Sequence, residues 1–347
     1  MCFPVFLCNL KNGSDFIDYK KNRTLMLLIP IVYLVLIMGL RNSSVGTDTA
    51  GYVRDLLRYS YISLDNLFSN GHAYGFYLFN KLMSYVCFEN YTIYLMTISI
   101  FVGISIYCFL AQNSDDYCMS QIMLLSLGFT FFFMTGIKQT IAMSILMYAY
   151  TAQKKRRYLK FVLLVLLAAS FHPTALVFLL ILPAKIVKLR KAIAVVAPAL
   201  IVFAYVFQKQ IFAFLKSLLT DDLYGAYGSV YVSSVNLTGL MIQLVIFGVS
   251  LFFLWKHLKD DEEASNLLSF YVIGMMFQAM TGVMGEFFRI SMYFSMLGVI
   301  LLPKAISKLE KRYRFFASFA ICLVFAVYFV FFSSKGSGVL PYKFFGE

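Results

Sequence analysis

A short polar segment follows the first long apolar run of the chain and carries residues that could hold a polar ligand. It reads Arg41-Asn-Ser-Ser-Val-Gly-Thr-Asp-Thr-Ala-Gly-Tyr52 and follows the apolar residues 25–40. Ionisable residues at a membrane boundary are costly and commonly mark a functional site, so Arg41 and Asp48 predict ligand binding. Two glycines permit a tight turn, and a threonine with an acid in the next turn predicts a short helix. A solvated loop with an interfacial arginine is the alternative interpretation.

Polar and ionisable side chains recur beside apolar runs at three later places. They are Lys138 with Gln139, His172, and Glu286 with Arg289 and Tyr293. Proline follows the histidine and cannot continue a helix, which predicts that the imidazole lies at a helix break. An imidazole there could act as a base near neutral pH, although a buried histidine paired to a carboxylate is an equally plain structural interpretation.

The composition identifies the class of protein that must position these residues. Hydrophobic residues make up 61% of the 347 residues and charged residues 14%, and the mean hydropathy is +0.77. Such a chain is an integral membrane protein. No long polar linker interrupts the apolar runs, so residues 1–347 are predicted to form a single integral membrane domain. The net charge of +13 lies in short basic clusters between apolar runs, which indicates topology signals and contacts with membrane lipid, and not nucleic acid.

The basic clusters orient the predicted helices. About ten spans are expected between residues 24 and 332, and the cluster at 154–157 faces the cytoplasm by the positive-inside rule. The membrane crossings counted back from that cluster agree with the earlier basic residues only if the amphipathic run 74–88 does not cross the membrane. This run is therefore predicted to be a re-entrant or interfacial helix. The larger extracytoplasmic loops are then 41–73 and 208–236. The expected fold is an all-α polytopic membrane bundle.

This topology assigns ionisable residues from five places in the sequence to the outer face. They are Arg41, Asp48, Lys138, His172, Glu286 and Arg289. Because charges at a membrane are expensive to keep, a convergent site is the working hypothesis. The six cysteines contain no C-x-x-C pair, and no acidic cluster has the spacing of a divalent metal site, so neither metal nor cofactor is expected.

The polar segment also resembles a family signature. Gly39-Leu-Arg41, then Val45-Gly-Thr-Asp48-Thr and Tyr52, resemble the signature of the EpsG family of Wzy-type polysaccharide polymerases. The three later places resemble further motifs of that family. Lys138-Gln139 stands where the family usually has arginine-glutamine, which keeps the charge and loses the bidentate geometry.

The resemblance implies a bacterial membrane glycosyltransferase of GT-C-like, all-helical fold. Such an enzyme polymerises oligosaccharide repeat units linked to undecaprenyl pyrophosphate at the outer face of the cytoplasmic membrane. Its donor and acceptor are both lipid-linked oligosaccharides, and the product would be capsule, exopolysaccharide or O-antigen. A flippase and a chain-length regulator could act beside it.

The resemblance also implies roles for the residues named above. Arg41 and Arg289, assisted by Lys138, would neutralise the leaving pyrophosphate. Asp48 or His172 would accept the proton of the attacking hydroxyl. The remaining residues would contact sugar or pyrophosphate, and they are Tyr52, Gln139, Glu286 and Tyr293.

Two other functions compete with this interpretation. A flippase for the same lipid-linked sugars should show two related halves and charges along a central cavity, and the sequence shows neither. A membrane O-acyltransferase that acts on the glycan could share a histidine and an arginine. The sugars, the linkage, the anomeric outcome and the oligomeric state stay open.

Overall fold

The computed structural model describes residues 19–63, 73–187, 190–218, 237–333 and 337–347. The secondary structure of these residues is helical apart from one isolated β-bridge between Arg41 and Phe344. The expected all-α membrane bundle is therefore confirmed. Parts of the two predicted outer loops, 64–72 and 219–236, lie outside the described residues.

The chain forms two compact units, which we describe separately. Unit 1 comprises the described residues up to Leu176 together with Lys311–Glu347, and unit 2 comprises Val177–Glu310. The helices of unit 1 are α2 (Tyr19–Gly39), α3 (Thr49–Tyr61), α4 (Tyr74–Cys87), α5 (Tyr91–Asn113), α6 (Tyr117–Ser126), α7 (Phe129–Thr135), α8 (Ile137–Lys154), α9 (Tyr158–Phe171), α18 (Lys311–Tyr328) and the π-helical turn η5 (Phe329–Ser333). The 3₁₀ helix η2 (Pro173–Leu180) spans the boundary between the units.

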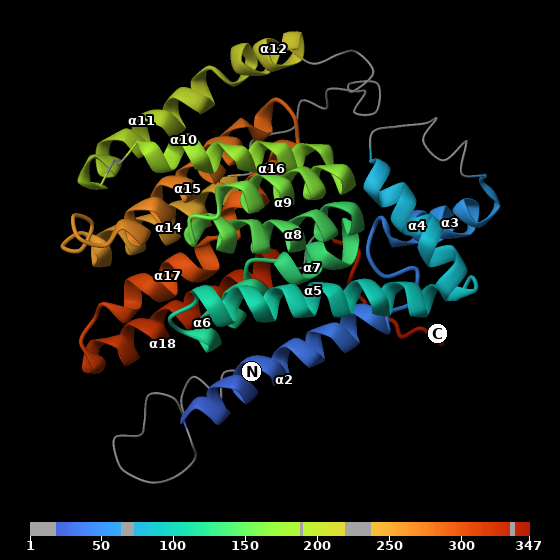
Figure 1. Cartoon of the computed structure of the whole chain (residues 1–347). Coiled ribbons are helices and arrows are strands. Elements are labelled where there is room, and N and C mark those ends of the chain that lie inside the picture. Colours follow the sequence, from blue (N-terminus) through green and yellow to red (C-terminus); the bar gives the residue numbers. More distant parts are fainter. Residues whose placement is uncertain (1–18, 64–72, 188–189, 219–236, 334–336) are drawn as a thin grey trace. The chain divides into compact units, whose positions relative to one another are not determined.

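Unit 1 is organised around a layer of long helices. α2 packs on α5, α5 on α8, and α8 on α9, and these four lie side by side in Figure 1. α3 and α4 pack against each other at one end of this layer, where α2 and α9 end and α8 begins (Figure 1). The packing therefore collects the polar segment after α2, the start of α8 and the end of α9 at the same end of unit 1.

Four described helices are long and apolar enough to cross a membrane on their own. They are Tyr91–Asn113, Leu237–Leu254, Phe287–Ser307 and Lys311–Ser333, and the number rises to six if each of two bent helix pairs is one span. The shorter apolar helices are Thr24–Gly39, Tyr158–Phe171 and Pro173–Ile186. The total of about ten crossings stays a prediction.

One expected span is broken in the middle. The apolar run 119–136 is continuous enough in the sequence to predict a single span, but α6 and α7 within it are bent by 56°. Gly128 lies between them at φ +81°, a left-handed conformation that other residues adopt only at a cost, and it starts α7 in a new direction. α8 then begins directly after Gly136.

Unit 2 contains the remaining helices. They are α10 (Ile181–Ile186), η3 (Arg190–Ala192), α11 (Ile193–Val206), α12 (Gln208–Leu218), α14 (Leu237–Leu254), α15 (Glu262–Ala279), η4 (Met280–Gly282), α16 (Phe287–Ser295) and α17 (Gly298–Ser307). α12 turns by 74° from the preceding helix. A core cluster of unit 2 includes Ala204, Met280, Phe287 and Ile290.

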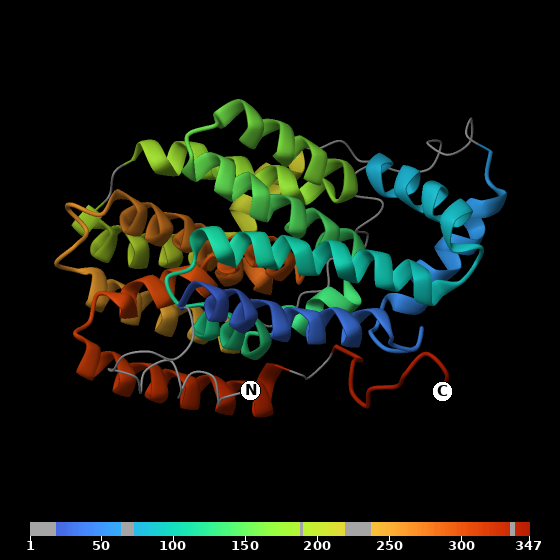
Figure 2. The ribbon, with the colours of Figure 1, turned by 60° about the horizontal axis from the view of Figure 1, so that its bottom comes forward.

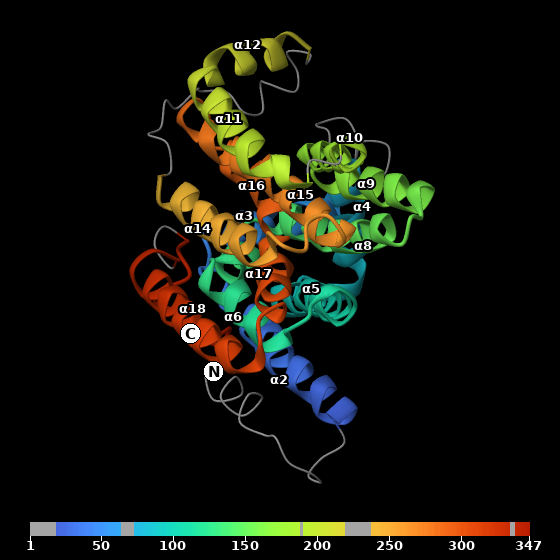
Figure 3. The same cartoon turned by 90° about the vertical axis from the view of Figure 1, so that its left-hand side faces the viewer.

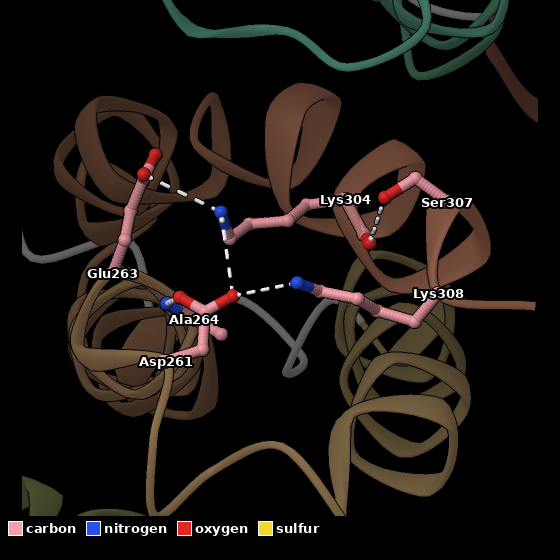
Figure 4. A network of polar contacts seen from close by, with 6 residues as sticks. All are labelled: Asp261, Glu263, Ala264, Lys304, Ser307 and Lys308. Atoms are coloured by element: carbon pink, nitrogen blue, oxygen red, sulfur yellow. Dashed lines mark hydrogen bonds and ion pairs between the residues drawn. The ribbon is translucent and has the colours of Figure 1, made fainter.

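An ionic network joins the start of α15 to the end of α17 (Figure 4). Asp261 Oδ2 lies 3.0 Å from Lys308 Nζ and 3.6 Å from Lys304 Nζ, and Lys304 also lies 3.3 Å from Glu263. The Ala264 N–H donates to Asp261 Oδ1 and caps the helix. Burial raises the pKa of Asp261, but the Ala264 N–H and the two lysines outweigh it, and the pKa lies below its usual value.

Candidate functional site

The loop between α2 and α3 is built around a buried arginine. Arg41 is 2% exposed, and its guanidinium donates to the carbonyl of Met38 at the end of α2 and to the carbonyl of Met134 in α7, the latter at 3.1 Å. The Thr49 hydroxyl donates to the same Met134 carbonyl at 2.9 Å. Arg41 therefore ties the end of α2 to α7, just before α8 begins.

Gly46 lets this loop approach α7 closely. Its φ is +94°, and a Cβ at this position would lie 2.5 Å from the Met134 carbonyl oxygen. Both observations exclude larger residues, because the conformation and the contact each disfavour a side chain. The prediction of a tight glycine turn followed by a short helix is confirmed, with α3 beginning at Thr49.

Arg41 stays charged at neutral pH in this setting. Burial lowers the pKa of Arg41 to about 10, and Tyr342 and Tyr94 partly offset the effect. Its Nε is buried and has no hydrogen-bond partner among the described residues. The predicted role of Arg41 in binding pyrophosphate is untested, but in this conformation its two terminal nitrogens donate to backbone carbonyls.

The end of the chain covers the same loop. Backbone hydrogen bonds join Asn42 N to Lys343 O at 2.9 Å and Gly46 N to Gly338 O at 2.8 Å. The Tyr342 hydroxyl donates to the Ile37 carbonyl at 2.7 Å. Figure 2 shows this C-terminal segment, in red, beside the start of the blue loop. We call residues 337–347 the C-terminal strap.

Lys138 lies among three aromatic rings in the first turn of α8. Its Nζ is 4.8 Å from the ring centroid of Phe76, 5.8 Å from that of Tyr77 and 5.9 Å from that of Tyr52. Ammonium groups are attracted to ring faces at such distances. The side chain is half-buried, and Asp55 on α3 is close enough to affect it electrostatically.

The donors of Lys138 are otherwise unused within the described residues. No hydrogen bond and no ion pair within 4.0 Å joins its Nζ to any residue of the described chain. The ring faces attract the positive charge of the ammonium, but they do not accept hydrogen bonds from its N–H groups as an oxygen atom would. Lys138 therefore presents a charged donor that could bind an anionic or hydroxyl-bearing ligand.

Two buried polar side chains of α4 and α5 lack a hydrogen-bond partner among the described residues. Asn80 and Tyr94 are 0% exposed, and neither the Asn80 amide nor the Tyr94 hydroxyl has a hydrogen-bond partner among the described residues. Asn80 lies one helical turn after Phe76 on the buried face of α4, and Tyr94 is close to Tyr52 and Asp55 electrostatically. Buried polar groups are nearly always satisfied in proteins, so these groups favour a polar ligand or water at this end.

His172 lies at the predicted helix break. It ends α9 with an extended backbone, and η2 begins at Pro173. Its Nδ1 forms a 2.6 Å hydrogen bond with the Thr174 hydroxyl. The preceding Phe171 packs against Phe79 of α4, with ring centroids 6.3 Å apart. The structure thus brings the end of α9 to α4, next to the elements that surround Lys138.

The other predicted residues of unit 1 differ in their accessibility. Asp48 is half-buried at the N-terminus of α3, and its side chain does not cap the helix. Tyr52 is half-buried and contacts Phe76 edge to face, with ring centroids 5.6 Å apart. Gln139 is 1% exposed, so its predicted contact with substrate would need a change of conformation.

The remaining predicted residues belong to unit 2. Arg289 Nε lies 3.1 Å from Glu286 Oε2, and both side chains are 37% exposed. Tyr293, on the same helix α16, is 0% exposed. The turn before α16 therefore brings Glu286 and Arg289 together and places Tyr293 in the interior.

Sequence reasoning missed several residues of the site. They are Asp55, Phe76, Tyr77, Asn80 and Tyr94, together with the C-terminal strap. The helical spacing of the sequence indicates some of them. Tyr52 and Asp55 are three residues apart, Phe76 and Asn80 are four residues apart, and each pair therefore shares a helix face. No sequence signal connects the strap to the loop.

Comparison with known families identifies the protein. The family model described as the EpsG family matches residues 24–344. The chain belongs to the EpsG family. This family is related to Wzy-like polymerases, so the chain is a membrane protein of polysaccharide biosynthesis. No curated protein and no solved structure matches it significantly. Among the described residues, no group of three His, Cys, Asp or Glu side chains could hold a metal ion.

Proposed function

We propose that this EpsG-family protein polymerises oligosaccharide repeat units carried on undecaprenyl pyrophosphate at the outer face of the bacterial cytoplasmic membrane. Membership of the family supports a polymerase-type glycosyltransferase. The observation that carries the proposal is Lys138, a half-buried ammonium held by three aromatic rings, with Asp55 nearby and no ion pair among the described residues. This arrangement suits a ligand that has both phosphate and sugar.

The reaction requires one bond to form and one to break. A hydroxyl oxygen of the incoming repeat unit attacks the anomeric carbon of the donor glycan. The bond from that carbon to the pyrophosphate oxygen breaks, and undecaprenyl pyrophosphate leaves with the electron pair. The proton of the hydroxyl passes to a base. Negative charge grows on the leaving oxygen, so a fixed cation lowers the barrier.

We assign that cation first to Lys138. Arg41 donates to the Met38 and Met134 carbonyls, whereas Lys138 keeps its donors available, so Arg41 supports the loop and its charge acts at a distance. The role expected for Arg289, which is paired with Glu286 in unit 2, stays a prediction. Tyr52 and Asp55 would contact the sugar, since aromatic faces and carboxylates suit C–H faces and hydroxyl groups.

We assign the base to His172. Imidazole titrates near neutral pH, and the Thr174 hydroxyl fixes the ring through Nδ1. Asp48, half-buried at the start of α3, would orient the attacking hydroxyl by accepting a hydrogen bond from it.

A genetic experiment tests the function. The gene is deleted, and the length of the lipid-linked glycans is read on a gel after complementation with wild type, Lys138→Gln or Lys138→Arg. Wild type and Lys138→Arg should restore long chains, and Lys138→Gln should leave single repeat units. Lys160→Gln, at an exposed lysine of α9, is the matched control and should restore long chains.

Other outcomes would support the competing functions. Long chains in the deletion strain would reject a polymerase. Loss of acyl label from otherwise long chains would favour the O-acyltransferase. Single repeat units held on the cytoplasmic side of the membrane would favour the flippase.

A further inference from the structure

Lys81 of α4 is a buried lysine outside the groups that surround Lys138. It is 5% exposed, and its Nζ donates to the carbonyl of Tyr59 at 3.0 Å and to the carbonyl of Ser60 at 3.1 Å. The same Nζ lies 5.0 Å from the ring centroid of Tyr85. A lysine is almost never fully buried unless its ammonium is paired. Here two carbonyls and a ring face take the place of water around the charge.

The two carbonyls belong to the last turn of α3. The last four carbonyls of an α-helix have no partner within the helix, and the helix dipole makes this end negative. Arg58 belongs to the same turn, but its side chain is exposed. Lys81 therefore satisfies two of these carbonyls from a neighbouring helix, and it holds the end of α3 on α4.

Hydrogen bonds from outside the helix thus fix α3 at both ends. At its start, the Thr49 hydroxyl donates to the Met134 carbonyl of α7 at 2.9 Å. At its end, Lys81 donates to the last turn. Tyr52 and Asp55 lie between these two points. Because α3 cannot swing away without breaking one set of bonds, both side chains keep their place beside the start of α8.

The same contact reaches Lys138 through two stacked rings. The Tyr59 ring stacks on the Tyr77 ring of α4, with centroids 5.6 Å apart and planes at 29°. The Tyr77 ring in turn lies 5.8 Å from Lys138 Nζ. α4 also packs on α9 (Figure 3). Lys81 is therefore connected to Lys138 through Tyr59 and Tyr77, although it does not touch Lys138.

We propose that Lys81 is a positioning residue of the site, which holds the last turn of α3 and so sets where Tyr52 and Asp55 lie relative to Lys138. The proposal rests on the proposed function and adds a residue that does not itself contact the substrate. Tyr52 and Asp55 are the proposed sugar contacts, whereas Lys138 and His172 keep their own contacts when Lys81 is replaced. Loss of Lys81 should therefore weaken substrate binding and leave the chemical step nearly unchanged.

Kinetics and hydrogen exchange of Lys81→Met test the proposal. The full-length protein in lipid nanodiscs is assayed well below its melting temperature, with the lipid-linked repeat unit varied in concentration. KM should rise about fivefold or more, while kcat falls less than about twofold. Amide hydrogen exchange at residues 58–61 should rise about tenfold or more. An unchanged KM, a fall in kcat with KM unchanged, or unchanged exchange would overturn the proposal.

Arg58→Gln is the matched control. It removes a positive charge from the same turn of α3 but leaves both hydrogen bonds of Lys81 in place. KM and the exchange of the last turn should both stay within about twofold of wild type. A rise in KM as large as that of Lys81→Met would mean that charge near the helix end acts, and it would overturn the assignment to Lys81.

Lysine footprinting of the folded wild-type protein decides the matter if Lys81→Met does not fold. Lys81 should react with an amine-specific reagent about tenfold or more slowly than Lys160, which is exposed on α9. Equal reaction of the two lysines would overturn the contact and the proposal with it.

The failure of this proposal and the failure of the proposed function are distinguishable, because footprinting and exchange do not depend on polymerisation. A protected Lys81 and faster exchange in Lys81→Met, together with no polymerisation by folded wild-type protein, would keep the contact and reject the function. Polymerisation by wild type with an unchanged KM for Lys81→Met would keep the function and reject the role of Lys81.

Discussion

At the residue scale, two cations from the same end of unit 1 differ in what surrounds them. Arg41 is nearly fully buried and donates hydrogen bonds to backbone carbonyls. Lys138 is half-buried and lies against aromatic rings, with no hydrogen bond or ion pair to another described residue. A guanidinium can donate to two carbonyls at once because its donors form a planar fork. Arg41 is therefore suited to hold structure, and Lys138 is suited to bind a ligand.

Replacement of Arg41 by lysine should destabilise the protein. An ammonium cannot donate to both the Met38 and Met134 carbonyls as the planar guanidinium does, and a lost bond to a charged group costs roughly 1.5–3 kcal/mol. Arg41→Lys should therefore lower the melting temperature in detergent. Arg54→Lys, at an exposed arginine of α3, is the control and should not. An unchanged melting temperature for Arg41→Lys would show that the buried contacts do not stabilise the loop.

The Asp261 network predicts a pH-dependent contribution to stability. The pKa of Asp261 is lower in the folded protein than its usual value, so its charged form stabilises the fold above about pH 4 and the benefit is lost as pH falls through the folded pKa. Asp261→Asn should lower the melting temperature at pH 7, and the difference from wild type should shrink below about pH 4. Asp260→Asn, at an exposed neighbour, is the control. A difference that stays constant with pH would contradict the assignment.

At the element scale, the C-terminal strap fixes the loop that leads to the site. Its backbone bonds to Asn42, Gly46 and Thr47 hold the loop against α7, where Arg41 and Thr49 share the Met134 carbonyl. Lys138 lies one turn after that carbonyl. The strap therefore positions Lys138 indirectly, through the loop and α7.

Removal of residues 337–347 should loosen the loop. The rate of amide hydrogen exchange at Gly46 and Thr47 should rise about tenfold or more. This rise corresponds to about 1.4 kcal/mol for the lost backbone hydrogen bonds. Tyr342→Phe, which loses the bond to the Ile37 carbonyl, should show a smaller rise near the end of α2. Tyr313→Phe, at an exposed tyrosine of α18, should show none. Unchanged exchange after truncation would mean that the strap does not hold the loop.

The elements were largely predictable from the sequence, and the contacts between them were not. Apolar runs and basic clusters located the helices, and Pro173 located the break at His172. The bend at Gly128 was missed because a left-handed glycine leaves the apolar pattern unchanged. The strap was missed because its bonds to the loop are made by backbone groups, which every sequence contains.

The site was predictable only in part for a similar reason. Charged residues beside apolar runs are conspicuous, so the sequence singles out Arg41, Lys138 and His172 as candidates. The rings around Lys138 come from α3 and α4, and aromatic residues are ordinary in a chain with 18% of them. Only the packing of α3 on α4 distinguishes Tyr52, Phe76 and Tyr77 from the rest.

At the scale of the whole molecule, the position of the basic clusters predicts the orientation in the membrane. The Arg41 loop lies at one end of unit 1, and the cluster at 154–157 follows α8, which begins beside that loop and runs away from it (Figure 1). The positive-inside rule then puts the cluster in the cytoplasm and the loop outside.

Single-cysteine labelling tests this orientation. In a background without native cysteines, Ser44→Cys and Arg157→Cys both place a thiol at an exposed position. A membrane-impermeant maleimide should label Ser44→Cys in intact cells and Arg157→Cys only after permeabilisation. The opposite pattern would put the site on the cytoplasmic side and exclude polymerisation at the outer face.

Lys138 is proposed to help this protein join lipid-linked repeat units. The most direct measurement uses purified protein in nanodiscs with a lipid-linked repeat unit as the only substrate, and mass spectrometry reads the products. Wild type and Lys138→Arg should produce a ladder of longer glycans and release one undecaprenyl pyrophosphate per bond formed. Lys138→Gln should react at a rate at least about 100-fold lower, in line with loss of a charge that stabilises a transition state. No ladder from folded wild-type protein, or an undiminished ladder from Lys138→Gln, would contradict this proposal.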